Sequence, residues 1–305
     1  QVLVVPEQER PDGNFPTVKS PNPEEWSAFE LAIAQGQAWG ADIIIGTDPD
    51  ADRMGAVVRH NGEYRILTGN QSGALMIYYV CSRLQERGKL PENGVVIKTI
   101  VTSEMGAKIA ESFGLQVMNT LTGFKYIGEK MTLFERTGTH SFVFGYEESY
   151  GYLAGMYARD KDAVLASMLI CEAAAYYKQQ GNTLIDVLEE LYARFGYFKE
   201  RLESRTLKGK EGMARIRAIM EEWRSAPPER IGGSRVARVL DYSTGIDDLP
   251  RENVLKFILE DGSWFCVRPS GTEPKIKCYF AVCGTSHADA DDRLSRLTSE
   301  VMAKI

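Results

Sequence analysis

Histidine and cysteine are scarce in this chain, and their positions exclude several kinds of site. The 305 residues include three histidines and five cysteines. No histidine stands within helical i, i+4 reach of another and no cysteine pair has the Cys-x-x-Cys spacing, so we do not expect a zinc site built from them. An odd number of scattered cysteines in a long chain is typical of a reducing compartment, which predicts a cytoplasmic protein.

Net positive charge and long apolar runs are also missing. Acidic residues outnumber basic ones, 42 to 36, and the formal net charge is −6. Such a balance disfavours nucleic acid and anionic membranes as partners, because both attract basic surfaces. The longest apolar stretch, residues 163–177, is interrupted by Ser167 and Glu172 and is shorter than the ~20 residues of a membrane span. We therefore expect neither a nucleic-acid nor a membrane partner.

Apolar residues up to about residue 190 follow a pattern that predicts alternating strands and helices. Strands are expected at residues 2–5, 41–45, 94–100, 115–120 and 141–145. Helices are expected after Pro23 and at residues 71–87, 105–113 and 161–179. The alternation favours an α/β fold with a largely parallel core. A length of 305 residues suggests two or three domains at ~150 residues per domain.

The remaining part of the chain predicts a different arrangement. Helices at residues 210–224 and 288–305 flank four expected strands, at residues 236–241, 254–259, 263–267 and 276–282. Asp261-Gly262 is a typical hairpin dipeptide. This order favours an α+β domain with an antiparallel sheet. The least structured joins are expected at residues 59–63 and 196–208.

Three aspartates follow the strand expected at residues 41–45. Asp48, Asp50 and Asp52 alternate in a tight loop and Arg53 comes next. Carboxylates so spaced repel one another unless they converge on a cation, and an all-oxygen set suits Mg²⁺. An EF-hand would need Gly at Arg53 and Glu at Arg59. A haloacid-dehalogenase phosphatase loop, strand-Asp-x-Asp-x-Thr/Val, would need Thr or Val where Asp52 stands, and a solvated acidic turn is the remaining alternative.

A second polar loop, residues 145–151, lies between glycines after another apolar strand. Glu147 and Ser149 stand two residues apart in it. A carboxylate and a hydroxyl at this spacing can hydrogen-bond vicinal sugar hydroxyls. The alternative is an exposed polar turn.

A third loop, residues 268–274, joins two of the later strands. Arg268, Ser270, Gly271 and Thr272 supply a guanidinium, two hydroxyls and open backbone N–H groups, which are the parts of a phosphate-binding nest. An ordinary strand-joining turn has a similar composition.

In this order, the three loops resemble those of the α-D-phosphohexomutase family, the phosphoglucomutases and phosphomannomutases, over essentially the whole chain. The resemblance implies phosphohexomutase-type α/β domains with mixed sheets and a C-terminal α+β domain with an antiparallel sheet. It implies Mg²⁺ on Asp48, Asp50 and Asp52. It also implies phosphosugar contacts for nine residues in the second and third loops and beside them, and catalytic roles for Arg53 and Lys161. The phosphosugar residues are Thr122, Gly123, Lys125, Glu147, Ser149 and the pair Arg268 and Ser270, and the phosphate loop adds Gly271 and Thr272.

In such enzymes a phosphoserine transfers its phosphoryl group to a sugar phosphate, and a sugar 1,6-bisphosphate serves as intermediate and activator. The serine loop, Thr/Ser-x-Ser-His-Asn-Pro, has no match here, and residues 20–23 (Ser-Pro-Asn-Pro) resemble a stretch of the family's second domain. We therefore expect family domains 2, 3 and 4 at residues 1–61, 62–190 and 200–305. The missing N-terminal domains would be partners, and this chain alone would be an inactive fragment.

The sugar loop narrows the expected substrate. With Glu148 and Tyr150, the sugar loop resembles the corresponding sequence of phosphoglucomutases and phosphopentomutases. Phosphoglucosamine mutases usually carry Gln between the Glu and the Ser, and Gly-His after the Ser. Glucose phosphate is the leading substrate, and pentose or mannose phosphate is the alternative within the family. A non-catalytic relative and a Mg²⁺-dependent phosphatase are the alternatives outside that activity.

Overall fold

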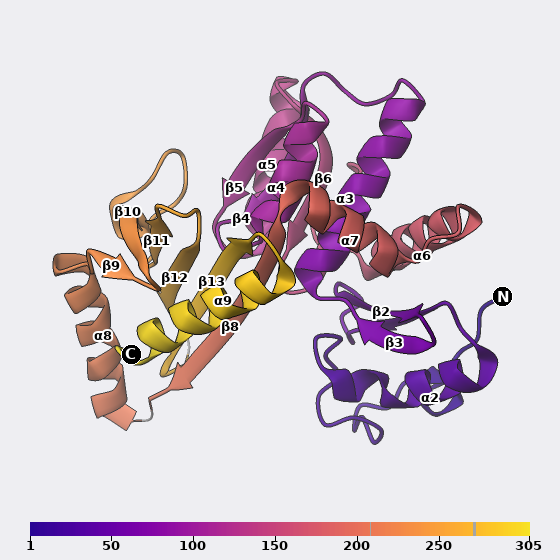
Figure 1. Cartoon of the computed structure of the whole chain (residues 1–305), viewed down its shortest axis with the longest axis horizontal. Helices are drawn as coiled ribbons and strands as arrows, with labels where there is room; N and C mark the ends of the chain where they lie inside the picture. Colours follow the sequence, from indigo (N-terminus) through magenta and orange to yellow (C-terminus); the bar gives the residue numbers. More distant parts are fainter. Residues whose placement is uncertain (208, 271–272) are drawn as a thin grey trace. The chain divides into compact units, whose positions relative to one another are not determined.

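The computed structural model describes residues 1–207, 209–270 and 273–305. It divides into two units, Gln1–Leu191 and Tyr192–Ile305 (Figure 1). In the described ranges, no helix has both the length and the apolar character needed to cross a membrane.

A three-stranded antiparallel sheet, in the order β1-β2-β3, opens the first unit. Its strands are β1 (Ile43–Thr47), β2 (Met54–His60) and β3 (Glu63–Ile66). The helix expected after Pro23 is a 3-10 turn, η1 (Trp26–Phe29), continued by α2 (Glu30–Trp39), and both pack on the sheet through a core of Phe29, Ile33, Ile44 and Val57.

Two expectations for this region are wrong. Residues 2–5 form no strand, and a short helix, α1 (Pro6–Glu9), follows them. The join expected at residues 59–63 is the tight turn of the β2–β3 hairpin, where Asn61 and Gly62 adopt positive φ angles of 50° and 85°. Left-handed backbone is the usual requirement of a two-residue hairpin turn, and Asn-Gly is well suited to it.

A mixed sheet in the order β5-β4-β6-β7 forms the rest of the first unit. Strand β4 is parallel to both β5 and β6, and β7 is antiparallel to β6. The strands are β4 (Gly94–Thr99), β5 (Gln116–Thr120), β6 (Ser141–Glu147) and β7 (Gly151–Ala154). The helices are α3 (Gly69–Glu86), α4 (Glu104–Ser112), α5 (Phe124–Thr137) and α6 (Ala163–Gln179), and α7 (Leu184–Phe195) follows. The expected strands and helices are confirmed, whereas β7, α5 and α7 were not expected.

Helices cover both faces of this sheet (Figure 1). Val95 and Ile97 of β4 pack with Phe124 and other residues of α5 on one face. On the other face the buried Tyr146 ring of β6 fits against Gly73 of α3. A Cβ on Gly73 would lie 2.4 Å from that ring, so glycine permits this close approach.

The second unit is a six-stranded antiparallel sheet in the order β8-β13-β12-β11-β10-β9. Its strands are β8 (Tyr197–Thr206), β9 (Arg230–Ile231), β10 (Ser234–Asp241), β11 (Leu255–Leu259), β12 (Trp264–Pro269) and β13 (Lys275–Gly284). Helices α8 (Gly209–Ser225) and α9 (His287–Met302) share one core with the sheet, and η2 (Tyr242–Thr244) follows β10. Within that core the Trp223 ring meets the rings of Phe257 and Phe265 edge-on, at 5.3 and 5.4 Å between centroids.

The join expected at residues 196–208 is also wrong, because β8 fills most of it. Strand β8 pairs with β13 along ten residues and lies at the edge of the sheet. Charged residues occupy much of its exposed length, as is common for edge strands that avoid pairing with other chains. Because of this composition, the sequence of β8 does not show the apolar pattern typical of a buried strand.

Candidate functional site

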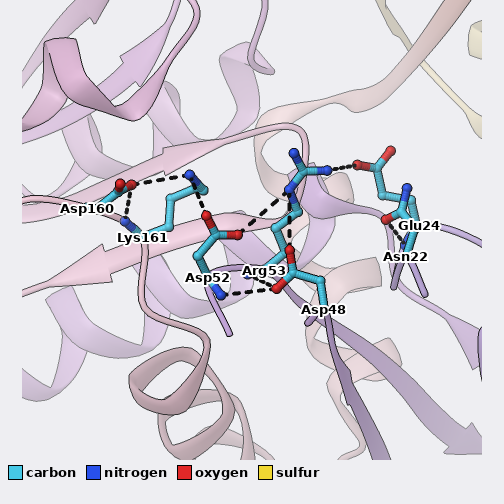
Figure 2. A network of polar contacts seen from close by, with 7 residues as sticks. All are labelled: Asn22, Glu24, Asp48, Asp52, Arg53, Asp160 and Lys161. Carbon is cyan, nitrogen blue, oxygen red and sulfur yellow. Dashed lines mark hydrogen bonds and ion pairs between the residues drawn. The ribbon is translucent and has the colours of Figure 1, made fainter. Parts of the chain in front are cut away.

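The aspartate loop lies between β1 and β2, and Asp48 shapes it. Asp48 Oδ1 accepts hydrogen bonds from the backbone N–H groups of Asp52 and Arg53, each at 3.0 Å (Figure 2). The loop reverses direction at Ala51, whose φ is 54°. One carboxylate thus satisfies two backbone donors of a tight turn, as Asp commonly does.

Lys161, at the start of the segment leading into α6, reaches the same loop. Its Nζ lies 2.9 Å from Asp52 Oδ2 and 3.2 Å from Asp160 Oδ1. Burial lowers the pKa of Lys161, but the hydrogen bonds that its ammonium group donates to Asp52 and Asp160 outweigh burial and raise that pKa above its usual value. Lys161 is therefore a fixed cation at this site.

Arg53 joins the network on the other side of the loop (Figure 2). Its Nη1 donates to Glu24 Oε1 at 3.3 Å, and its Nε lies 3.9 Å from both Asp48 Oδ2 and Asp52 Oδ1. Two cations therefore face three aspartates and one glutamate, so the cluster keeps an excess of negative charge. Glu24 and Asp160 were not expected as partners, and nothing in their sequence context indicates it.

The expected convergence of the three aspartates on one point is not present in this arrangement. In the described part of the chain, no three His, Cys, Asp or Glu side chains form a group that could hold a metal ion. Asp48 is engaged by the loop backbone, Asp52 is paired with Lys161, and Asp50 is exposed. The donor chemistry still fits Mg²⁺, because all three are carboxylates and Asp52 Oδ1 is buried without a hydrogen bond from the described residues.

Backbone contacts fasten the aspartate loop to the sugar loop, residues 145–151. Met54 N–H donates to the carbonyl of Tyr150 and Ala163 N–H donates to that of Ala51, both at 3.0 Å. Arg53 and Gly151 form an isolated β-bridge. Gly151 is required by space, since a Cβ there would lie 2.2 Å from Lys161 Cδ. The structure therefore brings two of the three predicted loops together.

Glu147 ends β6 and is buried, with 7% of its surface exposed. Its Oε1 accepts the backbone N–H of Gly123 at 2.7 Å, where φ is 118°. Burial raises the pKa of Glu147 to about 7, and the charge of Glu148 adds to the increase, while the Gly123 N–H, Lys161 and Arg53 oppose it. Near neutral pH this carboxyl can therefore either donate or accept a proton.

The other residues expected near Glu147 differ in their placement. Thr122 Oγ1 is buried and makes no hydrogen bond with the described residues. Ser149 is half-buried in the turn that leads to β7. Lys125 is exposed, and its Nζ lies 4.8 Å from the centre of the neighbouring Tyr126 ring. Gly123 thus contacts the Glu147 carboxylate directly, and Thr122 precedes Gly123 in the chain.

The phosphate loop belongs to the second unit, between β12 and β13. Arg268 donates from Nε and Nη2 to Glu252 Oε1, at 3.1 and 2.7 Å. Ser270 N–H donates to the carbonyl of Lys275 at 2.7 Å, and Ser270 Oγ accepts from Glu273 N–H at 3.3 Å. An anion that binds Arg268 must therefore share it with Glu252. Gly271 and Thr272 lie outside the described residues.

Comparisons with known proteins agree with the fold and identify a family. Family models of phosphoglucomutase/phosphomannomutase α/β/α domain II, α/β/α domain III and the C-terminal domain match residues 1–62, 68–195 and 205–298. A phosphoglucomutase of Staphylococcus haemolyticus is 40% identical over 283 residues, 89% of this chain and 50% of the relative. One from Staphylococcus aureus is 36% identical over 315 residues, 99% of this chain and 55% of the relative.

Solved structures extend the likeness at the level of fold. A phosphoglucomutase/phosphomannomutase family protein of Burkholderia thailandensis superposes with a TM-score of 0.65 at 20% identity, over 96% of this chain and 52% of that one. Parafusin, a phosphoglucomutase from Paramecium, gives 0.64 at 19% identity, over 86% and 44%. The chain spans about half the length of the curated relatives it matches.

Proposed function

The chain belongs to the phosphoglucomutase/phosphomannomutase family, and on that premise we propose that it forms the metal-, sugar- and phosphate-binding part of a phosphoglucomutase. The reaction is the interconversion of glucose 1-phosphate and glucose 6-phosphate, an isomerisation by phosphoryl transfer. One observation carries the proposal: the aspartate loop and the sugar loop are joined by the Met54–Tyr150 hydrogen bond and the Arg53–Gly151 bridge. A sugar bound at the sugar loop then lies beside Arg53 and Lys161, the two cations at the aspartate loop.

Phosphoryl transfer needs positioning and neutralisation of charge more than it needs covalent chemistry from the protein. Arg53 and Lys161 supply fixed positive charge at the aspartate loop. We propose Asp48, Asp50 and Asp52 as the residues that hold Mg²⁺, which supplies further neutralisation of phosphate charge when bound. Lys161 must then release Asp52 or share it with the ion.

Glu147 is the proposed sugar contact with the strongest structural support. It is buried, directed to the Gly123 N–H, and has a pKa near neutrality, so it suits a hydroxyl ligand in either hydrogen-bonding direction. Ser149 completes the proposed clamp, and Thr122 and Gly123 line its side. Lys125 is a further proposed contact, because it is exposed two residues after Gly123.

The proposed role of the second unit is to bind the phosphate that is not transferred. Arg268 is already fixed by Glu252, which holds its guanidinium in one orientation and limits the entropy lost on binding an anion. Ser270, Gly271 and Thr272 complete this proposed loop. The domain limits proposed for the chain are residues 1–61, 62–190 and 200–305.

No residue of these 305 lies in a Ser-His-Asn-Pro sequence, so we propose that the chain alone does not turn over. The phosphoserine would come from N-terminal domains of the same protein, and a sugar 1,6-bisphosphate would carry the phosphoryl group between them. An assay of the purified chain with glucose 1-phosphate should give no glucose 6-phosphate. Release of inorganic phosphate without isomerisation would favour the phosphatase alternative instead.

Binding tests the proposal on the chain as it stands. Glucose 1-phosphate, titrated calorimetrically with Mg²⁺ present, should bind the wild-type chain, and Arg268→Ala should weaken binding at least tenfold. Arg215→Ala changes an exposed arginine of α8 in the same unit and should leave binding unchanged. Equal effects of the two substitutions, or no binding by the wild type, would refute the assignment of Arg268. Tighter binding of ribose 1-phosphate than of glucose 1-phosphate would favour the pentose alternative.

A further inference from the structure

Glu148 lies between the two proposed sugar contacts, yet its own carboxylate is bound elsewhere in the first unit. Glu148 Oε2 accepts from Thr99 Oγ1 at 3.2 Å and from Thr102 Oγ1 at 3.0 Å. The two hydroxyl oxygens are 2.7 Å apart, so the three oxygens form a compact triangle. Each threonine has one hydroxyl hydrogen, and two of the three contacts are therefore hydrogen-bonded at any time.

The turn that carries the two threonines, residues 99–103, is itself rigidly held. Lys98 is fully buried, and its Nζ donates to the carbonyls of Thr99 and Thr102, at 3.4 and 3.1 Å. The same Nζ lies 3.1 Å from Glu104 Oε1. Val101 N–H donates to Thr99 Oγ1 at 3.3 Å. A buried lysine on the backbone side and a carboxylate on the hydroxyl side leave this turn little freedom.

The first residues of α3 contact both the Glu148 backbone and the turn at residues 99–103. A Cβ on Gly69 would lie 2.0 Å from the carbonyl oxygen of Glu148, so only glycine admits the loop at this distance. Asn70, 8% exposed, accepts the backbone N–H of Ser103 at 3.1 Å. The Glu148 backbone is thus confined by α3, while its side chain is confined by the β4–α4 turn.

We propose that Glu148 is a positioning residue, which acts through the Thr99 and Thr102 hydroxyls to hold Glu147 against Gly123 N–H and Ser149 in place for a sugar. The inference rests on the proposed function, because it assumes that Glu147 and Ser149 bind sugar hydroxyls. Glu147 is the last residue of β6, and Glu148 is the first residue of the turn that follows. Anchoring the Glu148 side chain therefore fixes the backbone at the point where it carries Glu147, whose Oε1 lies 2.7 Å from the Gly123 nitrogen.

A threonine pair makes the test specific. Thr99→Val with Thr102→Val removes both hydroxyls at nearly constant volume, whereas Thr99→Ser with Thr102→Ser keeps them. Thr137→Val, at an exposed threonine near the end of α5, is the matched control. Two measurements apply to each variant: the ratio of the dissociation constants for inorganic phosphate and glucose 1-phosphate, and the amide resonance of Gly123 in ¹⁵N-glycine-labelled protein.

We expect the double valine variant to lose at least tenfold in the preference for glucose 1-phosphate over inorganic phosphate. Its affinity for inorganic phosphate should stay within twofold of wild type, and the Gly123 resonance should shift upfield or broaden. The double serine variant and the Thr137→Val control should match wild type in both measurements. If the double valine variant does not fold, Thr102→Val alone gives the same test, because Thr102 makes the shorter contact to Glu148.

Two results would overturn the inference: an unchanged Gly123 resonance and preference in the valine variant, or a loss that the serine variant shares. If wild type does not distinguish glucose 1-phosphate from inorganic phosphate, the proposed function fails. The Gly123 resonance then still decides whether Glu148 positions Glu147.

Discussion

Neutralising Glu147 should stabilise the chain, by an amount that depends on pH. The pKa of this carboxyl is 4.5 in ordinary surroundings and about 7 in the fold, chiefly because it is buried. Well below pH 4.5 Glu147 is protonated in both the folded and the unfolded chain, so its ionisation does not change the free energy of unfolding. As the pH rises towards 7 the unfolded chain ionises first, and the folded state is disfavoured by about 3 kcal/mol once both are ionised. Glu147→Gln keeps the shape and an acceptor for Gly123 N–H, so it should remove that cost.

Urea unfolding between pH 5 and pH 8, without Mg²⁺ or substrate, measures this effect. The stability gained by Glu147→Gln over wild type should grow from about 1 kcal/mol at pH 5 to about 3 kcal/mol at pH 8. Glu190→Gln, at an exposed position of α7, is the control and should show a small difference that does not vary with pH. A constant difference for Glu147→Gln, or a loss of stability at pH 8, would refute the assignment of a raised pKa.

Three further predictions concern other parts of the chain. Gly151→Ala places a Cβ 2.2 Å from Lys161 Cδ and should destabilise the first unit by about 1–3 kcal/mol in thermal unfolding; an unchanged midpoint would contradict the packing described here. Trp223→Ala removes a ring at 4% exposure and should cost the second unit about 3–5 kcal/mol, with loss of its near-ultraviolet circular dichroism; a cost below about 1 kcal/mol would argue against that core. Asp52→Asn should weaken Mg²⁺ binding at least tenfold by calorimetry, whereas Asp42→Asn, at an exposed carboxylate of the same unit, should leave it unchanged; equal effects would reject Asp52 as a ligand.

Elements with strong periodicity could be predicted from the sequence, and elements whose pattern depends on tertiary context could not. Strand β4 and helices α3, α6 and α9 are marked by apolar spacing that their burial explains. Helix α5 follows Gly123 directly, without a side-chain cap, so its start has no local signal. Strand β8 is charged along its exposed edge, and its partner β13 begins about seventy residues later.

The same distinction holds at the site. The aspartate and sugar loops are each visible in the sequence because the residues of each lie within a few positions of one another. Contacts between distant segments cannot be seen in the sequence. Lys161 contacts Asp52, more than a hundred positions away in the chain, and Thr99 contacts Glu148, forty-nine positions away. The expected metal cluster differs for a local reason, since Asp48 satisfies backbone N–H groups of its own loop.

Turnover by a longer polypeptide tests the central proposal most directly. The chain, extended upstream by its own coding sequence to the length of its curated relatives, would be assayed with Mg²⁺ and glucose 1,6-bisphosphate. The quantity to compare is kcat/KM for the 1-phosphates of glucose, mannose and ribose. The proposal predicts the highest value for glucose 1-phosphate and a large loss of it in Glu147→Ala. A Ser-His-Asn-Pro loop in the extended sequence together with no turnover of any of the three sugars would contradict it.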